Sequence, residues 1–453
     1  MDQKQQLLLD TTRRLIRRGA LPNLAKVLTK SHPADIAGLF RYLDLKEQRI
    51  LFNLIEDAEK SAYVLSELDH TTGAQLLAQL DKETITEVLQ EMPYDDAVDI
   101  IQNMPEEVAE ELLSIMQVET SEEIEQLLQY GEDTAGGIMA TEFFALGEDL
   151  TVREAIAALQ EAKDLEMVFY VYVVNDQQQL VGVLSLRQLL TVPPHTPLSR
   201  IMTTEVISVG TGMDQEEVAQ QVARYNLLAV PVVDDQNRLV GIVTVDDVID
   251  VLREEATEDM LKMAGTSEEE LLYGHRSLKI ARLRLPWLIT SLFGGVVTGY
   301  LMWLFRATLE QIIALVTFVP VITGMGGNVG GQSSTIVVRG FATGRIDFST
   351  LTQVFFKELR VGLIMGVVCG VVVGLVAFLW HHNPYLGVVV GLAMVTAMMV
   401  AASMGVLAPS FFKKIGIDPA IASSPFVQTA NDISGILIYF GTATIFLKLL
   451  VVS

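Results

Sequence analysis

Five long apolar stretches follow one another in the last part of the chain. They are Trp287–Phe305, Ile312–Val338, Val361–Trp380, Tyr385–Ala408 and Pro425–Val452. Each approaches or exceeds the ~20 residues that a helix needs to cross a hydrocarbon core of ~30 Å. Buried helices of this length rarely occur five times in succession in a soluble protein. The pattern therefore predicts five transmembrane helices over residues 286–453, set in a lipid bilayer.

The first part of the chain has a shorter period. Between Pro33 and Met116, segments of 11–13 residues begin with a helix-start pattern such as Pro93-Tyr-Asp-Asp, continue as a short amphipathic run and end at a breaker. Short helices with this spacing bury one apolar stripe each by stacking on their neighbours. We expect residues 1–130 to form a helical superhelix that serves as a scaffold or sensor.

Two related modules follow, over residues 131–199 and 200–253. Met139-Ala-Thr-Glu-Phe matches Met202-Thr-Thr-Glu-Val, and the strand–turn–strand pattern around Gly182 matches the one around Gly241. The pair resembles tandem CBS modules, which commonly bind adenosine nucleotides or metals and regulate an attached domain. Gln188 stands in the first copy where an Asp would hold a ribose, which argues against ATP as a ligand.

Residues 248–285 carry a helical pattern that joins these modules to the membrane part. Acids near positions 250, 254 and 258 share one face at 3.6 residues per turn, and Lys279, Arg282 and Arg284 follow. We expect a single connecting helix here. The fold class is then a multi-domain α/β and α-helical membrane protein: helical superhelix, tandem CBS pair, long connecting helix and five transmembrane helices.

Charge separates the two parts of the chain. Its 453 residues include 32 Lys and Arg against 56 Asp and Glu, a formal net charge of −24, yet the mean hydropathy is +0.37. From Pro286 onward there are eight basic and five acidic residues, so the acidic excess lies wholly before that position. Such a chain is not expected to bind nucleic acid, which requires a basic surface. Cys369 is the only cysteine, which excludes an internal disulfide framework.

Loop charges predict the orientation in the membrane. The opening Met-Asp-Gln-Lys-Gln-Gln is polar and does not read as a signal peptide, so the large N-terminal part is expected in the cytoplasm. With the N-terminus inside, ten Lys and Arg flank the spans on the inner side and two on the outer side. This agrees with the positive-inside rule, and five spans then place the C-terminus outside.

The second apolar stretch is rich in glycine. Five glycines occur within nine positions after Pro320, in Gly-Met-Gly-Gly-Asn-Val-Gly-Gly-Gln, which ends at Gln332. Backbone freed from helical bonding is tolerated at membrane depth where it is buried in protein or lines a wet cavity. The alternative is close packing of helices through small residues. Asn328 and Gln332 beside the glycines favour a polar passage.

The fifth stretch contains Asp432, the only acid within the five apolar stretches. A carboxylate in a membrane costs about 2.5 kcal/mol or more, so it normally faces water or a partner and marks an ion pathway. The alternative is an acid at the membrane interface. Because the one basic residue in the apolar stretches, Lys448, is sixteen positions further along the chain, a cation is the natural partner of Asp432.

At this point nearly the whole chain resembles the MgtE family of magnesium channels. The resemblance rests on the superhelix, the CBS pair, the acidic connecting helix, the string that ends at Gln332 and Asn431-Asp432-Ile-Ser-Gly. It implies a homodimer in a bacterial plasma membrane whose second and fifth spans line one pore. It also implies that Asp432 binds Mg²⁺, with Gly326, Gly327, Asn328, Gln332 and Asn431 lining the pore. No ATPase motif is present, and we expect no enzymatic activity.

The resemblance further implies that cytosolic Mg²⁺ acts as a regulator. In the family, bound Mg²⁺ bridges the N-terminal domain, the CBS pair and the connecting (plug) helix and closes the pore. The matching positions are Asp95, Asp99, Gly136, Ala223, Asp247, Asp250, Glu255, Glu258, Asp259 and Asp418, with Glu216 as a further candidate. Asn226 departs from the family's aspartate, which weakens the site shared with Asp250. From charge alone these acids equally fit a solvated surface.

Three functions remain distinguishable at this point. A divalent-cation channel driven by the membrane potential predicts conduction that is lost with Asp432→Ala. A secondary transporter predicts transport coupled to a proton or sodium gradient. A nucleotide-sensing membrane receptor predicts tight adenosine binding and no flux. The sequence does not rank Mg²⁺ against Co²⁺, Mn²⁺ or Ni²⁺.

Overall fold

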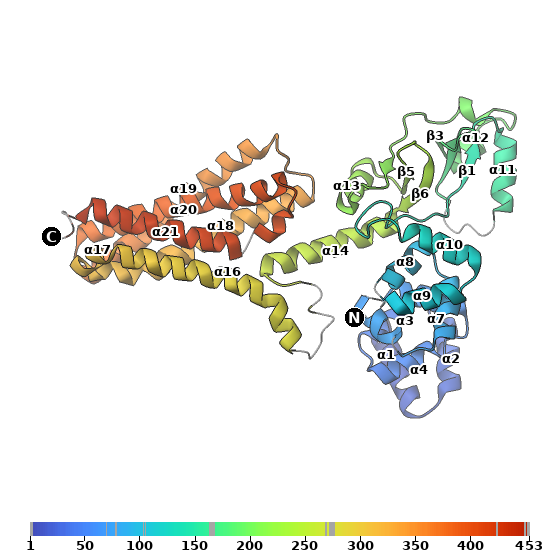
Figure 1. The fold of residues 1–453 in the computed structure, drawn as a ribbon, viewed down its shortest axis with the longest axis horizontal. Helices are drawn as coiled ribbons and strands as arrows, with labels where there is room; N and C mark the ends of the chain where they lie inside the picture. Colours follow the sequence, from blue (N-terminus) through green and yellow to red (C-terminus); the bar gives the residue numbers. More distant parts are fainter. Residues whose placement is uncertain are drawn as a thin grey trace. The chain divides into compact units, whose positions relative to one another are not determined.

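A computed structural model describes residues 3–68, 70–77, 79–102, 104, 106–162, 168–267, 270, 277–422, 425–447 and 450. The chain divides into two compact units, Met1–Leu252 and Arg253–Ser453, which are described separately (Figure 1).

The first unit opens with a stack of short helices. They are α1 (Gln3–Arg17), α2 (Leu21–Lys30), α3 (Pro33–Phe40), α4 (Leu45–Phe52), α5 (Ala58–Ser66), α6 (His70–Leu77), α7 (Lys82–Gln90), α8 (Tyr94–Gln102), α9 (Glu106–Ile115) and α10 (Val118–Leu127). From α3 onward each helix packs on the next but one: α3 on α5, α5 on α7 and α7 on α9, with α4, α6, α8 and α10 stacked likewise. This two-row stack is the predicted superhelix.

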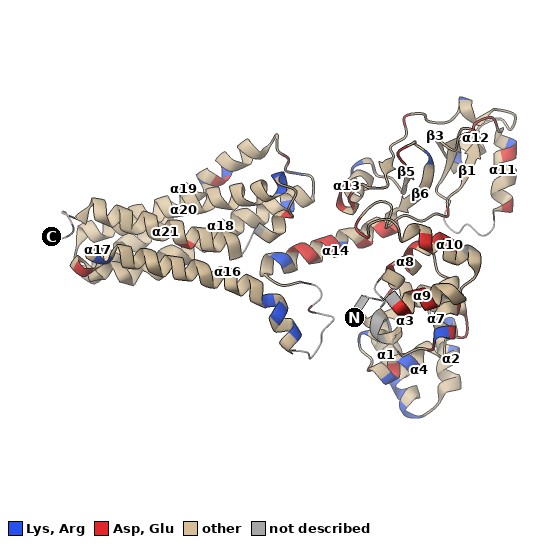
Figure 2. Ribbon diagram, in the orientation of Figure 1, with Lys and Arg blue, Asp and Glu red and all other residues tan. Residues whose placement is uncertain are grey.

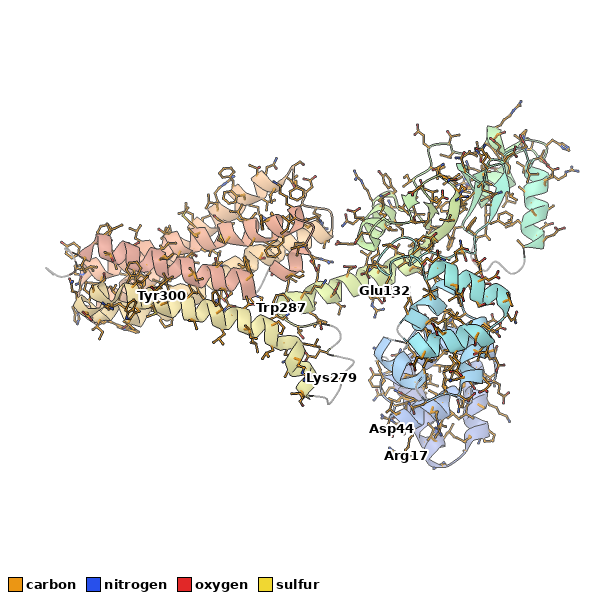
Figure 3. All side chains as sticks on the ribbon, viewed as in Figure 1. Arg17, Asp44, Glu132, Lys279, Trp287 and Tyr300 are labelled. Carbon is orange, nitrogen blue, oxygen red and sulfur yellow. The ribbon has the colours of Figure 1, made fainter. Side chains whose placement is uncertain are left out.

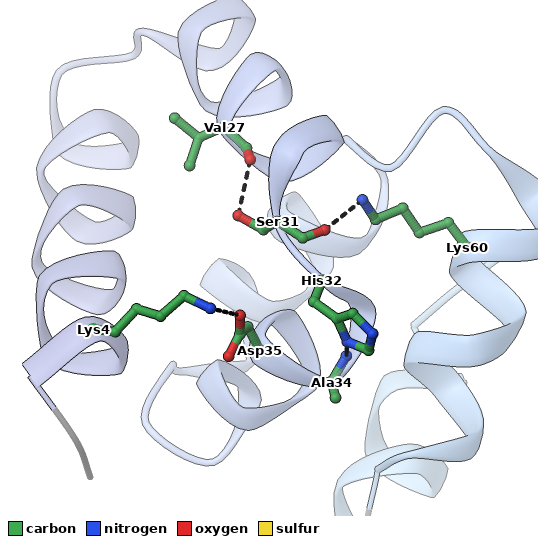
Figure 4. Close-up of polar contacts among 7 residues, drawn as sticks. All are labelled: Lys4, Val27, Ser31, His32, Ala34, Asp35 and Lys60. Atoms are coloured by element: carbon green, nitrogen blue, oxygen red, sulfur yellow. Dashed lines mark hydrogen bonds and ion pairs between the residues drawn. The ribbon is translucent and has the colours of Figure 1, made fainter.

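Local capping explains why these helices are short and sharply bounded. The side chain of Asp44 accepts hydrogen bonds from the backbone of Lys46 and Glu47, and Glu47 closes a capping box at the start of α4. The end of α2 is held from another helix, because Lys60 Nζ donates to the carbonyl oxygens of Leu28 and Ser31, each at 2.7 Å. Figure 4 shows the bond to Ser31. Such bonds satisfy the backbone groups that a helix end leaves unpaired.

The same close-up shows two more contacts that fix the beginning of α3. His32 Nδ1 accepts a hydrogen bond from the backbone N–H of Ala34 at 3.3 Å, and Lys4 of α1 pairs with Asp35 at 2.5 Å (Figure 4). Pro33 occupies the first helical position, where its missing N–H costs nothing.

Two small sheets of identical topology follow. The first contains β1 (Ala145–Gly147), β2 (Tyr170–Val174) and β3 (Leu180–Ser185), and the second β4 (Val209–Gly210), β5 (Ala229–Val233) and β6 (Leu239–Thr244). In each the first strand is parallel and the third antiparallel to the central strand. Both central pairs shift register at matching places, Val173/Val174 and Val232/Val233. The predicted sequence repeat is therefore a structural repeat.

Helices and reciprocal contacts complete the CBS-like pair. The helices are α11 (Val152–Glu161), α12 (Leu186–Thr191) and α13 (Gln215–Tyr225), with a 3₁₀ turn at Leu198–Arg200. A methyl group on Gly182 would clash with Met202, and one on Gly241 with Met139, so each copy inserts its methionine against the glycine of the other. The glycines are required by this close approach.

α14 (Val245–Ala264) runs from the second sheet, across the boundary between the two units. It ends at Ala264 because Gly265 adopts a left-handed φ of +77°. The next described helix, α16, begins only at Ser277. The single helix expected over residues 248–285 is therefore wrong.

The second unit is a bundle of long helices. It contains α16 (Ser277–Leu304), α17 (Arg306–Gln311), α18 (Val319–Ala342), α19 (Leu351–His381), α20 (Pro384–Lys414) and α21 (Pro425–Ile445), with 3₁₀ turns at Ile313–Phe318 and Pro419–Ala422. α20 packs against α18, α19 and α21, and α16 packs against α21. Figure 3 labels Lys279, Trp287 and Tyr300 in order along α16, from its basic beginning into its apolar length.

Four helical segments of the described residues are long and apolar enough to cross a membrane: Ser277–Leu304, Ile313–Ala342, Leu351–His381 and Pro384–Lys414. α21, the fifth predicted span, falls outside this group because Gln428, Asn431 and Asp432 make its first half polar. It nevertheless packs among the others, and part of its predicted end, at 448, 449, 451 and 452, lies outside the described residues.

Candidate ion pathway and acidic contact faces

The glycine-rich segment of α18 is helical throughout, from Val319 to Ala342. The expectation of backbone freed from helical bonding is therefore wrong, and the alternative of small-residue packing describes the structure. A methyl group on Gly330 would overlap Asn431 Nδ2 of α21, and one on Gly327 would lie 3.4 Å from Gln428 Cγ. Glycine thus lets α18 and α21 approach closely.

Asn431 holds this contact together. Its side chain is 1 % exposed, and its Nδ2 donates a hydrogen bond to the carbonyl oxygen of Gly326 at 3.3 Å. Its Oδ1 is buried without a hydrogen-bond partner among the described atoms. Asn431 and the carbonyl group of Gly326, both expected to line a pore, bind each other at this contact between the two helices.

Three other polar residues do face outward in this region. Asn328 and Gln332 are exposed one turn apart on α18, and Asp432 is half-buried on α21, directly after Asn431. Gly327, half-buried, adjoins Asn328. The exposed amides of Asn328 and Gln332 and the half-buried carboxylate of Asp432 are called the polar stripe below. Cations are the partners that its single carboxylate favours.

A second group of acids lies in the first unit, where α8 meets the beginning of α14. Figure 2 marks the acidic residues of both helices in red. Burial, followed by the charge of Asp96, raises the pKa of Asp95 to about 7, and burial and the charge of Asp247 raise that of Asp96 to about 7. Burial and the charge of Asp95 do the same for Asp247. The charges that raise these pKa values are all carboxylates.

These residues fit a divalent cation in their chemistry. Oδ1 of Asp95 is buried and has no hydrogen-bond partner among the described atoms. The charges of Asp99 and Asp250, two further predicted ligands, also act on Asp96. Oxygen-only, negatively charged surroundings are those that Mg²⁺ prefers. Within the described residues, however, no three His, Cys, Asp or Glu side chains already converge on one ion position.

Sequence reasoning did not single out Asp96 and Asp246 in this group. Asp96 lies in the Pro93-Tyr-Asp-Asp pattern between two residues that were predicted, and Asp246 directly precedes Asp247. The hydroxyl of Thr244 donates to both Asp246 and Asp247, at the start of α14. Two adjacent acids at each place were the signal that the sequence offered. Only the structure shows that both members of each pair raise the pKa of their neighbours.

Other predicted ligands are spread over the first unit. The backbone N–H of Gly136, which is buried, donates to the carbonyl oxygen of Thr211 at 2.9 Å. Glu216 lies in the first turn of α13 and Ala223 near its end, seven positions apart and so about 10 Å along the axis. Asn226 caps this helix in the left-handed conformation, φ 52°. A single ion therefore does not join Glu216 and Ala223 within one chain.

Gln188 and Asp247 occupy corresponding places in the two CBS copies. Gln188 Oε1 accepts from the backbone N–H of Ser185 at 2.8 Å, and Asp247 Oδ2 accepts from that of Thr244 at 3.1 Å. Each side chain therefore closes the first turn of the following helix. The second copy keeps a carboxylate at this place and the first does not.

A third group lies within the second unit. Lys262 Nζ of α14 lies 2.5 Å from Glu258 Oε1 and 2.6 Å from Asp418 Oδ2, which precedes the 3₁₀ turn before α21. Burial and the charge of Asp418 raise the pKa of Asp259 to about 6, opposed by Lys262 and Arg339. Burial alone would lower the pKa of Lys262, but its bonds to Asp418 and Glu258 raise it.

Lys262 was not among the predicted site residues. Its ammonium group sits between Glu258 and Asp418, two residues predicted to bind a metal, and takes the place that a cation would fill. Glu255 lies one turn earlier on α14 and is half-buried.

Comparison with known proteins decides the family. A family model described as a divalent cation transporter, MgtE, matches residues 319–442, the MgtE intracellular N domain matches 31–133, and CBS domains match 135–197 and 198–254. The chain belongs to the MgtE family. The magnesium transporter MgtE of Thermus thermophilus is 41% identical over 326 residues, 71% of this chain and 72% of the relative. That of Bacillus subtilis is 38% identical over 322 residues, 71% of each chain.

Two solved structures resemble the cytosolic part. A crystal structure of the cytosolic domain of the Mg²⁺ channel MgtE in complex with ATP matches with a TM-score of 0.51 and 38% identity, over 54% of this chain and 99% of that one. A crystal structure of the soluble part of a magnesium transporter matches with a TM-score of 0.51 and 33% identity, over 56% of this chain and 99% of that one. These findings confirm the predicted fold class and the CBS pair. Because the MgtE relatives are transporters, they also confirm that the chain is not an enzyme.

Proposed function

We propose that this chain carries Mg²⁺ across a bacterial plasma membrane along the polar stripe of α18 and α21, with Asp432 as the ion-binding carboxylate. The observation that carries the proposal is the position of Asp432, half-buried on α21 and next to Asn431, which lies against α18. Its support from relatives is that the MgtE proteins of Thermus thermophilus and Bacillus subtilis are magnesium transporters.

The stripe needs a second copy of the chain. Polar side chains on membrane helices are stable where protein or water covers them, not where they face lipid. Asn328 and Gln332 are exposed on a single chain. A homodimer that apposes two stripes encloses a polar passage and brings two copies of Asp432 to one axis. Two carboxylates suffice for Mg²⁺, which keeps most of its water.

The membrane potential supplies the driving force in this proposal. It is worth about 2.3 kcal/mol per charge per 100 mV, and roughly twice that for a divalent ion. The N-terminus lies in the cytoplasm, because the basic residues flank the spans on that side, and the C-terminus lies outside. Ions then enter the cell without coupling to another gradient.

Cytosolic Mg²⁺ closes the passage by neutralising the acidic faces. Asp95, Asp96 and Asp247 raise one another's pKa, so their ionised forms repel, at ~1 kcal/mol per close pair in water-like surroundings and more where solvent is excluded. A divalent cation between α8 and α14 removes that repulsion, with Asp99 and Asp250 as further ligands. Gly136, Glu216, Ala223, Glu255, Glu258, Asp259 and Asp418 are the remaining proposed ligands.

Patch recording on liposomes that contain the purified protein tests both parts. Asp432→Asn is expected to reduce Mg²⁺ current by roughly tenfold to a hundredfold, because a ligand bond to a charged group is worth about 1.5–3 kcal/mol. Glu310→Gln, which removes an exposed acid before the 3₁₀ turn at Ile313, is the matched control and should conduct normally. A current that does not change when Mg²⁺ is titrated on the cytoplasmic side would contradict the gating proposal but not the proposed pathway.

A further inference from the structure

A second carboxylate is buried in the helical bundle, on a helix that the proposed pathway does not use. Glu358 belongs to α19 and is 4 % exposed. It escapes a search of apolar stretches because it precedes Val361, where the predicted span begins, whereas the helix itself begins at Leu351. A buried ionisable group in a membrane bundle is costly and normally has a defined partner.

The partners of Glu358 are on one side a hydroxyl and on the other an ammonium group. Ser333 Oγ of α18 donates to Glu358 Oε2 at 2.9 Å, in a bond between two buried side chains. Lys357 Nζ lies 3.5 Å from Glu358 Oε1, and the Lys357 side chain is 64% exposed. The exposed ammonium group of Lys357 thus balances the charge of the carboxylate at Oε1, while Oε2 accepts a hydrogen bond from α18.

Ser333 lies one turn beyond Gly330 on α18. A methyl group on Gly405 of α20 would overlap the carbonyl oxygen of Gly330 and lie 2.8 Å from Ser333 Cβ, so α18 is in close contact with α20 there. The other side of Gly330 lies against Asn431. The stretch of α18 from Gly330 to Ser333 therefore makes three contacts. It binds Glu358 of α19, packs against α20 and lies against the residue before Asp432.

This stretch has few side chains to fix its position. Interdigitated side chains set the rotation and height of most packed helices, but at Gly326, Gly327 and Gly330 α18 presents bare backbone to α21. Breaking a hydrogen bond between two buried side chains leaves a buried group unpaired, at a cost of about 1–3 kcal/mol, which is enough to select one arrangement.

We propose that Glu358 is a positioning residue for ion passage: through Ser333 it holds α18 at the rotation and height at which Gly330 meets Asn431, the residue directly before Asp432. The inference rests on the proposed function, because it concerns the same stripe. It assigns Glu358 no contact with the ion. Loss of the bond lets α18 shift on its glycines, which changes which ions the stripe accepts.

The test compares variants of the full-length protein in liposomes, with the ratio of Mg²⁺ to Ca²⁺ current as the readout. Ser333→Ala and Glu358→Leu are expected to lower the ratio by about threefold or more, the range that changes within a packed network produce. Glu358→Gln keeps an oxygen acceptor for Ser333 and should stay within about twofold of the parent. Ser403→Ala removes a hydroxyl that donates within its own helix, to Met399, and is the matched control.

A double variant makes the assignment sharper. If the two residues act through one bond, Ser333→Ala combined with Glu358→Leu is no worse than Glu358→Leu alone. Glu358→Gln as damaging as Glu358→Leu would overturn the proposal, because the charge and not the bond would then matter. An unchanged ratio in Ser333→Ala would overturn it as well. Should Glu358→Leu fail to fold, Ser333→Ala, which loses a single oxygen, still decides.

Asp432→Asn separates this inference from the proposed function. If Asp432→Asn keeps the Mg²⁺ current of the parent, the pathway itself is wrong. If that current falls at least tenfold while Ser333→Ala keeps its ion ratio, the pathway stands and only the role of Glu358 fails.

Discussion

At the scale of single residues, the ion pairs of Lys262 change how two of the proposed metal ligands are interpreted. Glu258 and Asp418 are proposed metal ligands, yet each lies within 2.6 Å of the Lys262 ammonium group. A lysine between two carboxylates reduces their mutual repulsion as a bound metal ion would, without an ion from solution. This part of α14 is therefore held to the loop before α21 even when metal is scarce.

Replacing Lys262 by Met is expected to make that attachment depend on Mg²⁺. Without metal, Glu258 and Asp418 then repel instead of sharing a cation, a loss of about 1–2 kcal/mol for a partly exposed charged pair. Amide hydrogen exchange in the last turns of α14 should become roughly tenfold faster, and added Mg²⁺ should reverse the change.

Lys262→Arg keeps the charge and serves as the control for this variant. It should exchange at close to the parent rate in the absence of metal. Exchange in Lys262→Met that matches the parent without Mg²⁺ would mean that Lys262 does not hold α14 in place.

At the scale of elements, sequence patterns located the helices and sheets well but missed several limits and contacts. The repeats around Gly182 and Gly241 predicted two matching sheets, because a period of two and turn residues are local signals. Gly265 ends α14 within a pattern that looked continuous. The hydrogen bond between Lys262 and Asp418 joins residues 156 positions apart, so no local pattern contains it.

The candidate site was also predictable from the sequence only in part. Asp432 stands out because an acid in an apolar stretch is visible in the sequence alone. The burial of Asn431 and the pairing of Glu358 with Ser333 are not visible there, because both depend on which face of one helix meets another. A sequence of small residues also does not distinguish an unwound segment from a closely packed helix, and the structure shows the latter in α18.

The packing of α8 on the start of α14 predicts a pH dependence. Asp95, Asp96 and Asp247 have pKa values raised to about 7, against 3.8 ordinarily. The folded chain then keeps protons that the unfolded chain has released, so the contribution of these three groups to stability is greatest below about pH 4 and falls until about pH 7. The slope is about 1.4 kcal/mol per pH unit for each proton retained.

Thermal unfolding of the metal-free, full-length protein in detergent measures this effect. The melting temperature of the cytosolic transition should fall between pH 5 and pH 7.5, and Mg²⁺ should restore it at pH 7.5. Asp95→Asn is expected to flatten the profile, whereas Asp235→Asn, at an exposed position in the same unit, should not. A melting temperature that rises over this pH range would contradict the proximity of the three carboxylates.

At the scale of the whole molecule, exposure in a single chain has two meanings. Asn328 on α18 and Val371 on α19 are both exposed in the helical bundle, Val371 by 57%. An apolar side chain there is stable against lipid, and a polar one is stable only against water or protein. The pathway with two copies therefore predicts that these positions meet different surroundings in the assembled protein.

Cysteine labelling distinguishes them. The chain has one cysteine, so Cys369→Ala provides a background in which Asn328→Cys, Gln332→Cys and Val371→Cys are placed singly. A charged thiol reagent that does not cross membranes requires water, so it should modify Asn328→Cys and Gln332→Cys in liposomes and block their Mg²⁺ current. Val371→Cys should neither react nor lose current, because a thiolate does not form in hydrocarbon. Equal labelling at Asn328→Cys and Val371→Cys would show that the stripe is not enclosed by a second copy.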